Sequence, residues 1–130
     1  MTLNAELKKQ LIDSVKTLVP NLRCIYLFGS FHSNQATEKS DIDIAILADY
    51  KLLPVARWEI QSELATILNR EVDLVDLLSA STVMQFQVIK EGSCLYDLGN
   101  SAARFEMQVM SMYQHLNLER ADILNEVMGH

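Results

Sequence analysis

The stretch from residue 26 to residue 47 decides the fold. It reads Tyr-Leu-Phe-Gly-Ser at 26–30, then ten further residues, then Asp-Ile-Asp-Ile-Ala-Ile-Leu at 41–47. The first part predicts the apolar end of a strand and an abrupt turn at Gly29, because glycine adopts turn conformations at little steric cost. The second part predicts a strand on which Asp41 and Asp43 face the same side, about 7 Å apart, because strand side chains alternate. Its isoleucines then occupy the opposite side.

This pair of carboxylates predicts a metal site. Two carboxylates on one side of a strand that is otherwise suited to burial are costly unless a cation lies between them. Mg²⁺ is the usual solution, since it binds a few carboxylates together with the oxygens of a nucleotide phosphate. Gly29 and Ser30 lead into a possible helix start, where backbone N–H groups and a hydroxyl are available to a phosphate. The stretch therefore predicts a metal–nucleotide site.

A third strand-like run, Glu-Val-Asp-Leu-Val-Asp-Leu at 71–77, contains two further aspartates. Asp73 lies within the run, and two interpretations stay open for it. It is either a third catalytic carboxylate, which the first motif favours, or a polar residue on an edge strand. Asp76 stands at the end of the run, where a cap or a turn explains it without catalysis.

Hydrophobic periodicity and Pro/Gly stop signals predict the remaining elements. The chain of 130 residues is long enough for one domain with a real core, and we expect a single domain over residues 1–130. Trp58, the only tryptophan, is expected in the core rather than as a platform for a base. The expected strands are 23–28, 41–47, 71–77 and 93–96, and the expected helices are 3–18, 55–68, 82–91 and 100–128.

Together, Gly29-Ser30, the ten-residue gap, Asp41-x-Asp43 and the later Asp73 resemble the nucleotidyltransferase superfamily that includes DNA polymerase beta and kanamycin nucleotidyltransferase. At this length the chain looks most like the minimal nucleotidyltransferases (MNT proteins), the antitoxin halves of HEPN/MNT pairs. The resemblance covers a catalytic core of roughly residues 22–98. It implies an α/β (α+β) fold of the polymerase beta type, a small mixed sheet flanked by helices.

The same resemblance implies roles for the site residues. Asp41 and Asp43 would hold two Mg²⁺ ions, and Asp73 would complete one of the two metal sites and is a candidate proton acceptor. Gly29 and Ser30 would clamp the β- and γ-phosphates of ATP, the substrate. The implied activity is transfer of AMP to a tyrosine hydroxyl of a HEPN ribonuclease toxin, with which the chain would form a hetero-oligomer.

Two alternatives remain open at this point. The chain could be an antitoxin that masks its toxin by binding alone, because Phe-His-Ser-Asn follows Ser30 where many relatives carry an arginine and a glycine. It could instead be a small-molecule nucleotidyltransferase whose second subunit completes the acceptor pocket. The intact Asp41, Asp43 and Asp73 count against the masking alternative.

The expected last helix, about residues 100–128, is apolar over much of its circumference. This predicts contact with a partner protein or with a second copy, and methionines suit an adaptable surface. The alternative is that the helix wraps its own domain. Its main stripe comprises Phe105, Val109, Met112, Leu116, Ile123 and Val127, while Met107, Met110, Tyr113 and Leu118 lie off it.

Composition excludes several classes of protein. The net charge of −6 and a pI near 4.9, without a Lys/Arg cluster, disfavour direct binding of nucleic acid. No apolar run of about 18 residues is present, so no membrane span is expected. Without a recognisable signal peptide we expect a cytoplasmic protein, in which Cys24 and Cys94 are reduced and buried.

Overall fold

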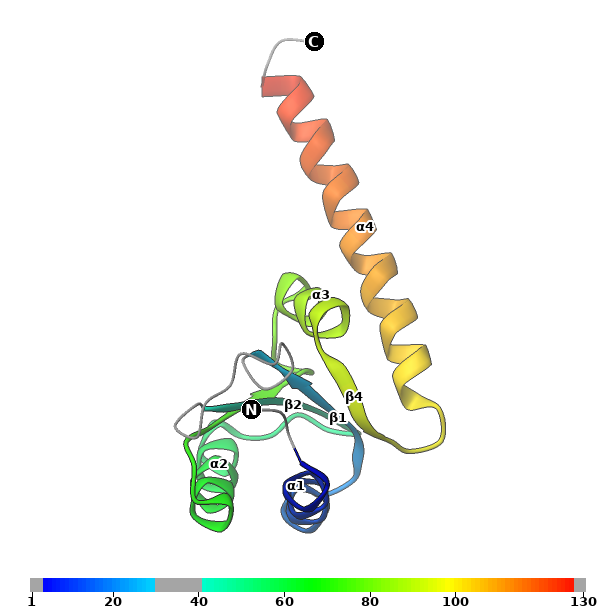
Figure 1. The fold of residues 1–130 in the computed structure, drawn as a ribbon. Coiled ribbons are helices and arrows are strands. Elements are labelled where there is room, and N and C mark those ends of the chain that lie inside the picture. Colours follow the sequence, from blue (N-terminus) through cyan, green and yellow to red (C-terminus); the bar gives the residue numbers. More distant parts are fainter. Residues whose placement is uncertain (1–3, 30–40, 128–130) are drawn as a thin grey trace.

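The computed structural model describes residues 4–29 and 41–127, with side chains to residue 121 (Figure 1). Each predicted helix and strand is present, and each end lies within two residues of its expected position. Within the described ranges the elements are α1 (Ala5–Leu18), β1 (Leu22–Phe28), β2 (Ile42–Ala48), α2 (Pro54–Leu68), β3 (Val72–Asp76), α3 (Thr82–Glu91), β4 (Ser93–Asp97) and α4 (Ser101–Val127).

The four described strands form one sheet in the order β3-β2-β1-β4. β1 runs antiparallel to both of its neighbours, whereas β2 and β3 are parallel. The expectation of a small mixed sheet flanked by helices is therefore confirmed. The two central strands, β1 and β2, are covered by helices on both sides, which explains why their sequences are apolar on both faces.

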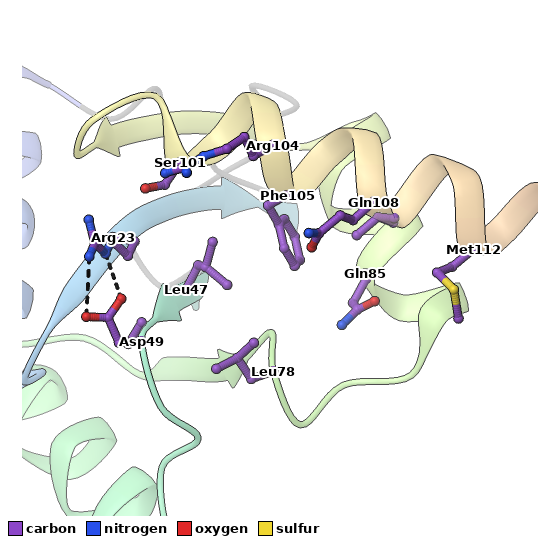
Figure 2. A pocket seen from close by; sticks show the side chains of 12 residues that line it. Arg23, Leu47, Asp49, Leu78, Gln85, Ser101, Arg104, Phe105, Gln108 and Met112 are labelled. Atoms are coloured by element: carbon purple, nitrogen blue, oxygen red, sulfur yellow. Dashed lines mark hydrogen bonds and ion pairs between the residues drawn. The ribbon is translucent and has the colours of Figure 1, made fainter.

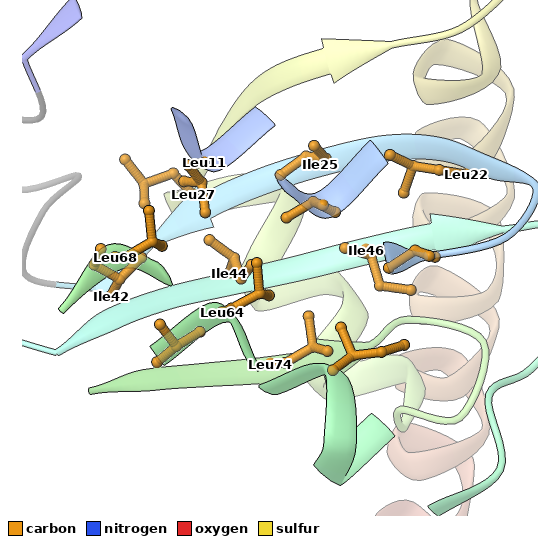
Figure 3. Close-up of a cluster of buried hydrophobic side chains, with 14 of the residues drawn as sticks. Leu11, Leu22, Ile25, Leu27, Ile42, Ile44, Ile46, Leu64, Leu68 and Leu74 are labelled. Atoms are coloured by element: carbon orange, nitrogen blue, oxygen red, sulfur yellow. The ribbon is translucent and has the colours of Figure 1, made fainter. Parts of the chain in front are cut away.

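The sheet separates two hydrophobic clusters. The isoleucines of β2 at 42, 44 and 46 pack with Leu11 and Val15 of α1 and with Leu64 of α2 (Figure 3). Ala45 and Leu47 of β2 face the other way, in a cluster with α3 and α4. Because strand side chains alternate, Asp41 and Asp43 lie on the same side as this second cluster.

α2 also covers the outer edge of β3. The backbone N–H of Leu74 donates to Gln61 Oε1 at 2.9 Å, and the Leu74 carbonyl accepts from Arg57 Nη1 at 3.0 Å. These bonds satisfy backbone groups that an edge strand would otherwise leave free for pairing with another chain. Arg57 therefore has a structural role at this edge.

The prediction that Trp58 lies in the core is wrong, because Trp58 is 60% exposed. The buried face of α2 is formed by Ile60, Leu64 and Leu68. At about 100° per residue, Trp58 points roughly 160° away from Ile60 around the helix. Of the two cysteines, Cys24 is buried as expected, but Cys94 is exposed on the edge strand β4; both are free thiols.

α4 packs on the domain only through its first half. Ala102, Phe105 and Val109 are buried, and the Tyr113 ring stacks on Phe86 of α3 at 3.9 Å between centroids. Figure 1 shows the second half of α4 extending past α3, away from the sheet. The alternative in which this whole helix wraps its own domain is therefore wrong. In the part of the chain that the structure describes, no helix is both long and apolar enough to cross a membrane.

Asp76 is a structural residue, as its place at the end of a strand predicted. Asp76 is buried, with only 4% of its surface exposed. Its carboxylate accepts from the Leu52 N–H at 2.8 Å, the Leu78 N–H at 3.2 Å and the Ser79 hydroxyl at 3.1 Å. The side chain thereby joins the loop before α2 to the turn after β3.

Replacing Asp76 by alanine should lower the free energy of unfolding by about 2–4 kcal/mol, because three donors lose their acceptor. Asp73→Ala is the matched control, since Asp73 is exposed and belongs to the same strand. Urea denaturation of both variants measures the difference. Equal stability of Asp76→Ala and wild type would contradict the structural role.

Candidate active site

The sheet brings the three predicted aspartates together. β2 and β3 pair in parallel with Asp43 directly opposite Asp73, and Asp41 lies two residues before Asp43. Neighbouring strands are about 4.8 Å apart, and residues in register point to the same side of a sheet. The three carboxylates therefore share one end of the sheet and its α3/α4 side. Asp73 does lie on an edge strand, yet its register places it beside the first motif.

The three carboxylates also act on one another electrostatically. Asp43 is half-buried, while Asp41 and Asp73 are exposed. The pKa of Asp43 is raised, chiefly by burial and then by the negative charges of Asp73 and Asp41. A group of negative charges that disfavours its own ionisation is stabilised by a cation.

Gly29 lies directly against the Asp43 carboxylate. β1 pairs with β2 so that Phe28 is opposite Asp43, and Gly29 then turns with a φ of +73°. A Cβ atom at Gly29 would overlap Asp43 Oδ2 and lie 3.0 Å from its Cγ. Both the left-handed backbone and the lack of space require glycine here. The position of Ser30, the other predicted phosphate ligand, falls outside the described residues.

The site residues fit a divalent cation by type. Carboxylate oxygens are the ligands that Mg²⁺ prefers. In the described ranges, 4–29 and 41–127, no three carboxylate, histidine or cysteine side chains converge closely enough to enclose an ion. However, Asp41 and Asp73 are exposed, so both side chains are free to rotate towards Asp43. Their strands already place them at the same edge.

A cavity of about 540 Å³, which no sequence pattern predicted, lies at the other end of the sheet (Figure 2). Its lining comes from β1, the end of β2, the turn after β3, α3 and α4. These segments are far apart in the chain, so no local pattern could indicate that they share a cavity.

Comparison with known proteins assigns the chain to a family. Residues 9–100 match the family model described as polymerase beta, nucleotidyltransferase. The chain belongs to this family. The matched range includes every described strand of the sheet together with Gly29, Asp41, Asp43 and Asp73.

One similar protein is the protein adenylyltransferase MntA of Shewanella oneidensis. It is 42% identical over 123 residues, which cover 95% of this chain and 88% of the relative. A chain in the crystal structure of a toxin–antitoxin with AMP-PNP matches with a TM-score of 0.83 and 43% identity, covering 94% of this chain and 98% of that one. A chain in the structure of a tri-AMPylated S. oneidensis HEPN toxin with its MNT antitoxin matches with a TM-score of 0.77 and 42% identity, covering 94% and 96%.

Replacing Gly29 by alanine should displace the Asp43 carboxylate and weaken Mg²⁺ binding about 10- to 100-fold. Gly99→Ala is the matched control, because Gly99 has a φ of +63° but no atom within 4 Å of the added Cβ. Both variants carry the backbone strain of a left-handed residue, so only the contact with Asp43 differs between them. Isothermal titration with Mg²⁺ measures this difference. Equal affinities in the two variants would show that the contact has no role.

Replacing Asp43 by asparagine should raise the melting temperature at pH 7 when divalent ions are absent. The pKa of Asp43 in the folded protein lies above its ordinary value, so ionisation of its carboxylate destabilises the fold. This destabilisation develops as the pH rises through the ordinary pKa of an aspartate, about 3.9, and then through the raised pKa of Asp43. It is absent well below the ordinary pKa. Thermal unfolding between pH 3 and pH 7 measures the trend, with Asp13→Asn on the exposed side of α1 as the control. A variant less stable than wild type at pH 7 would contradict the repulsion.

Proposed function

We propose that this protein is an antitoxin that transfers AMP from ATP to a tyrosine hydroxyl of a cognate HEPN ribonuclease toxin. The observation that carries the proposal is the placement of Asp41, Asp43 and Asp73 beside Gly29 at one end of a nucleotidyltransferase sheet. The similarity to MntA, and to an MNT antitoxin in complex with a tri-AMPylated toxin, supports the choice of AMP and of a protein acceptor.

Each residue of the site has a distinct part in this proposal. Asp41 and Asp43 would hold two Mg²⁺ ions, and Asp73 would complete the coordination of one of them. When bound, the metal ions supply positive charge that activates the attacking oxygen and neutralises the leaving oxygen. Gly29 and Ser30 would clamp the β- and γ-phosphates, Gly29 through its backbone N–H and Ser30 through its hydroxyl.

The transfer itself is a single displacement at the α-phosphorus of ATP. The tyrosine oxygen forms a bond to this phosphorus, and the bond from the phosphorus to the oxygen that bridges to the β-phosphate breaks. Pyrophosphate leaves with the electron pair of that bond. The proton of the tyrosine hydroxyl passes to Asp73, whose exposed carboxylate is open to an acceptor arriving from solvent.

We further propose that residues 1–130 form a single domain whose two parts have separate roles. The catalytic core spans about residues 22–98, and α4 provides the surface on which the toxin packs. The second half of α4 supports this assignment, because it extends away from the domain with Leu118 62% exposed (Figure 1). A reaction that consumes ATP to silence a ribonuclease belongs in the cytoplasm, where both ATP and RNA are present.

The decisive test is transfer of label from α-labelled ATP, with Mg²⁺, onto the purified HEPN toxin. We expect label on a toxin tyrosine with wild type and none with Asp41→Asn or Asp43→Asn, because each variant loses a metal ligand. Mass spectrometry locates the modified residue, and omission of Mg²⁺ should abolish transfer by wild type. Asp13→Asn, on α1, is the matched control and should transfer normally.

Two outcomes would overturn the proposal. Transfer retained by both Asp41→Asn and Asp43→Asn would exclude the carboxylate site as the catalytic centre. A tight complex with the toxin that never carries label, even with ATP and Mg²⁺, would show that the protein neutralises its toxin by masking alone.

A further inference from the structure

The cavity at the far end of the sheet has an apolar floor and a polar rim. Leu47, Phe105 and Val109 form part of its lining and are each less than 10% exposed. Gln85 of α3 and Gln108 of α4 line the side of it towards Met112, as Figure 2 shows. A volume of about 540 Å³ is enough for a large side chain and part of its neighbours.

The rim carries a positive charge that none of the described residues pairs with. Arg23 pairs with Asp49 at 2.7 Å, so these two charges offset each other. Arg104 is exposed and makes no ion pair with any residue that the structure describes. In a chain of net charge −6, a free guanidinium beside an apolar cavity is suited to a carboxylate of another molecule.

Two amide side chains at the cavity also have unused hydrogen-bonding groups. Gln85 Nε2 donates to the Leu77 carbonyl at 2.7 Å, which holds the side chain while its Oε1 has no partner among the described residues. The exposed side chain of Gln108 makes no hydrogen bond with any residue that the structure describes. Both amides can therefore bond to the backbone of an inserted segment.

α4 also carries an uncharged stripe on the side that points away from the domain. Residues 103, 107, 110, 114, 118 and 121 follow one another at helical spacing and read Ala, Met, Met, Gln, Leu and Ala. Met107 is 73% exposed and Met110 is 55% exposed. Arg104 lies one turn before Met107, between this stripe and the side of the helix that lines the cavity. An exposed, uncharged stripe that contains two methionines is typical of a protein contact surface.

We propose that the cavity receives an apolar side chain of the HEPN toxin, with an adjacent toxin carboxylate paired to Arg104 and the rest of the segment lying along α4. The inference rests on the proposed function, because it names where the substrate protein is held. Anchors of this kind, seated in pockets at the centre of an interface, carry most of the binding energy of protein complexes. Two copies of this chain, each with a charge of −6, repel one another and are a poorer fit.

The cavity lies at the opposite end of β2 from Asp43, about five residues or roughly 17 Å away along the strand. The anchor would therefore hold the toxin without touching ATP or the carboxylates. Binding of the toxin and chemistry at the α-phosphorus should then be separable by mutation.

Two variants test the anchor. Arg104→Glu reverses the charge on the rim, and Gln108→Trp fills the cavity; both residues are exposed, so both variants should fold. We expect each variant to raise the Kd for the toxin at least about tenfold and to raise the KM for the toxin, with kcat and the KM for ATP unchanged. Arg104→Lys should retain most of the affinity.

Lys9→Glu is the matched control, because Lys9 is an exposed cation of α1, which lies on the opposite side of the sheet from α4. It should leave the Kd and the KM for the toxin close to wild type. Titration calorimetry with the toxin and steady-state AMP transfer provide the measurements, and thermal unfolding checks that every variant is folded.

The outcomes separate this inference from the proposed function. Normal toxin affinity in both Arg104→Glu and Gln108→Trp, with normal AMP transfer, would overturn the anchor and leave the proposed function intact. An equal loss of affinity in Arg104→Glu and Lys9→Glu, with none in Gln108→Trp, would reduce the effect to net charge and also overturn it. A wild-type protein that neither binds nor modifies the toxin would overturn both.

Discussion

The in-register parallel pairing of β2 with β3 is the constraint on which the rest of the structure depends. It sets Asp43 beside Asp73, and it sets Ile44 beside Leu74 on the opposite face. A slip of one residue would send the carboxylates into the α1/α2 core and the apolar side chains towards the site. Burial of Ile44 and Leu74 therefore holds the register, and the same register assembles the carboxylate site.

Two aspartates of β3 have different roles because their environments differ. Asp76 is buried and takes three hydrogen bonds, so it joins two loops. Asp73 is exposed and faces the charge of Asp43, whose pKa it helps to raise. The first arrangement stabilises the fold, whereas the second stores repulsion that a bound cation would relieve. The fold tolerates the free-energy cost of this repulsion because the hydrophobic cluster of α1, α2 and the β2 isoleucines stabilises the other side of the sheet.

α4 combines two surfaces in one helix. Its 27 residues give a length of about 40 Å, which is more than its packing on the sheet requires. Phe105 and Val109 belong to the core and also form the floor of the cavity, while Met107 and Leu118 face solvent. Rigid support on one side and an adaptable apolar stripe on the other are properties that suit a helix for holding a partner protein.

The sequence by itself determined the helices and strands, because hydrophobic periodicity and Pro/Gly signals act over a few residues. It also identified Asp41, Asp43 and Gly29 as one candidate site, since alternation along a strand and the turn next to it are local properties. Only the tertiary structure decided that Asp73 lies beside Asp43 and that Trp58 faces solvent. The strand order, the burial of one helix face and the cavity beside α4 arise from contacts between distant segments, which no local pattern encodes.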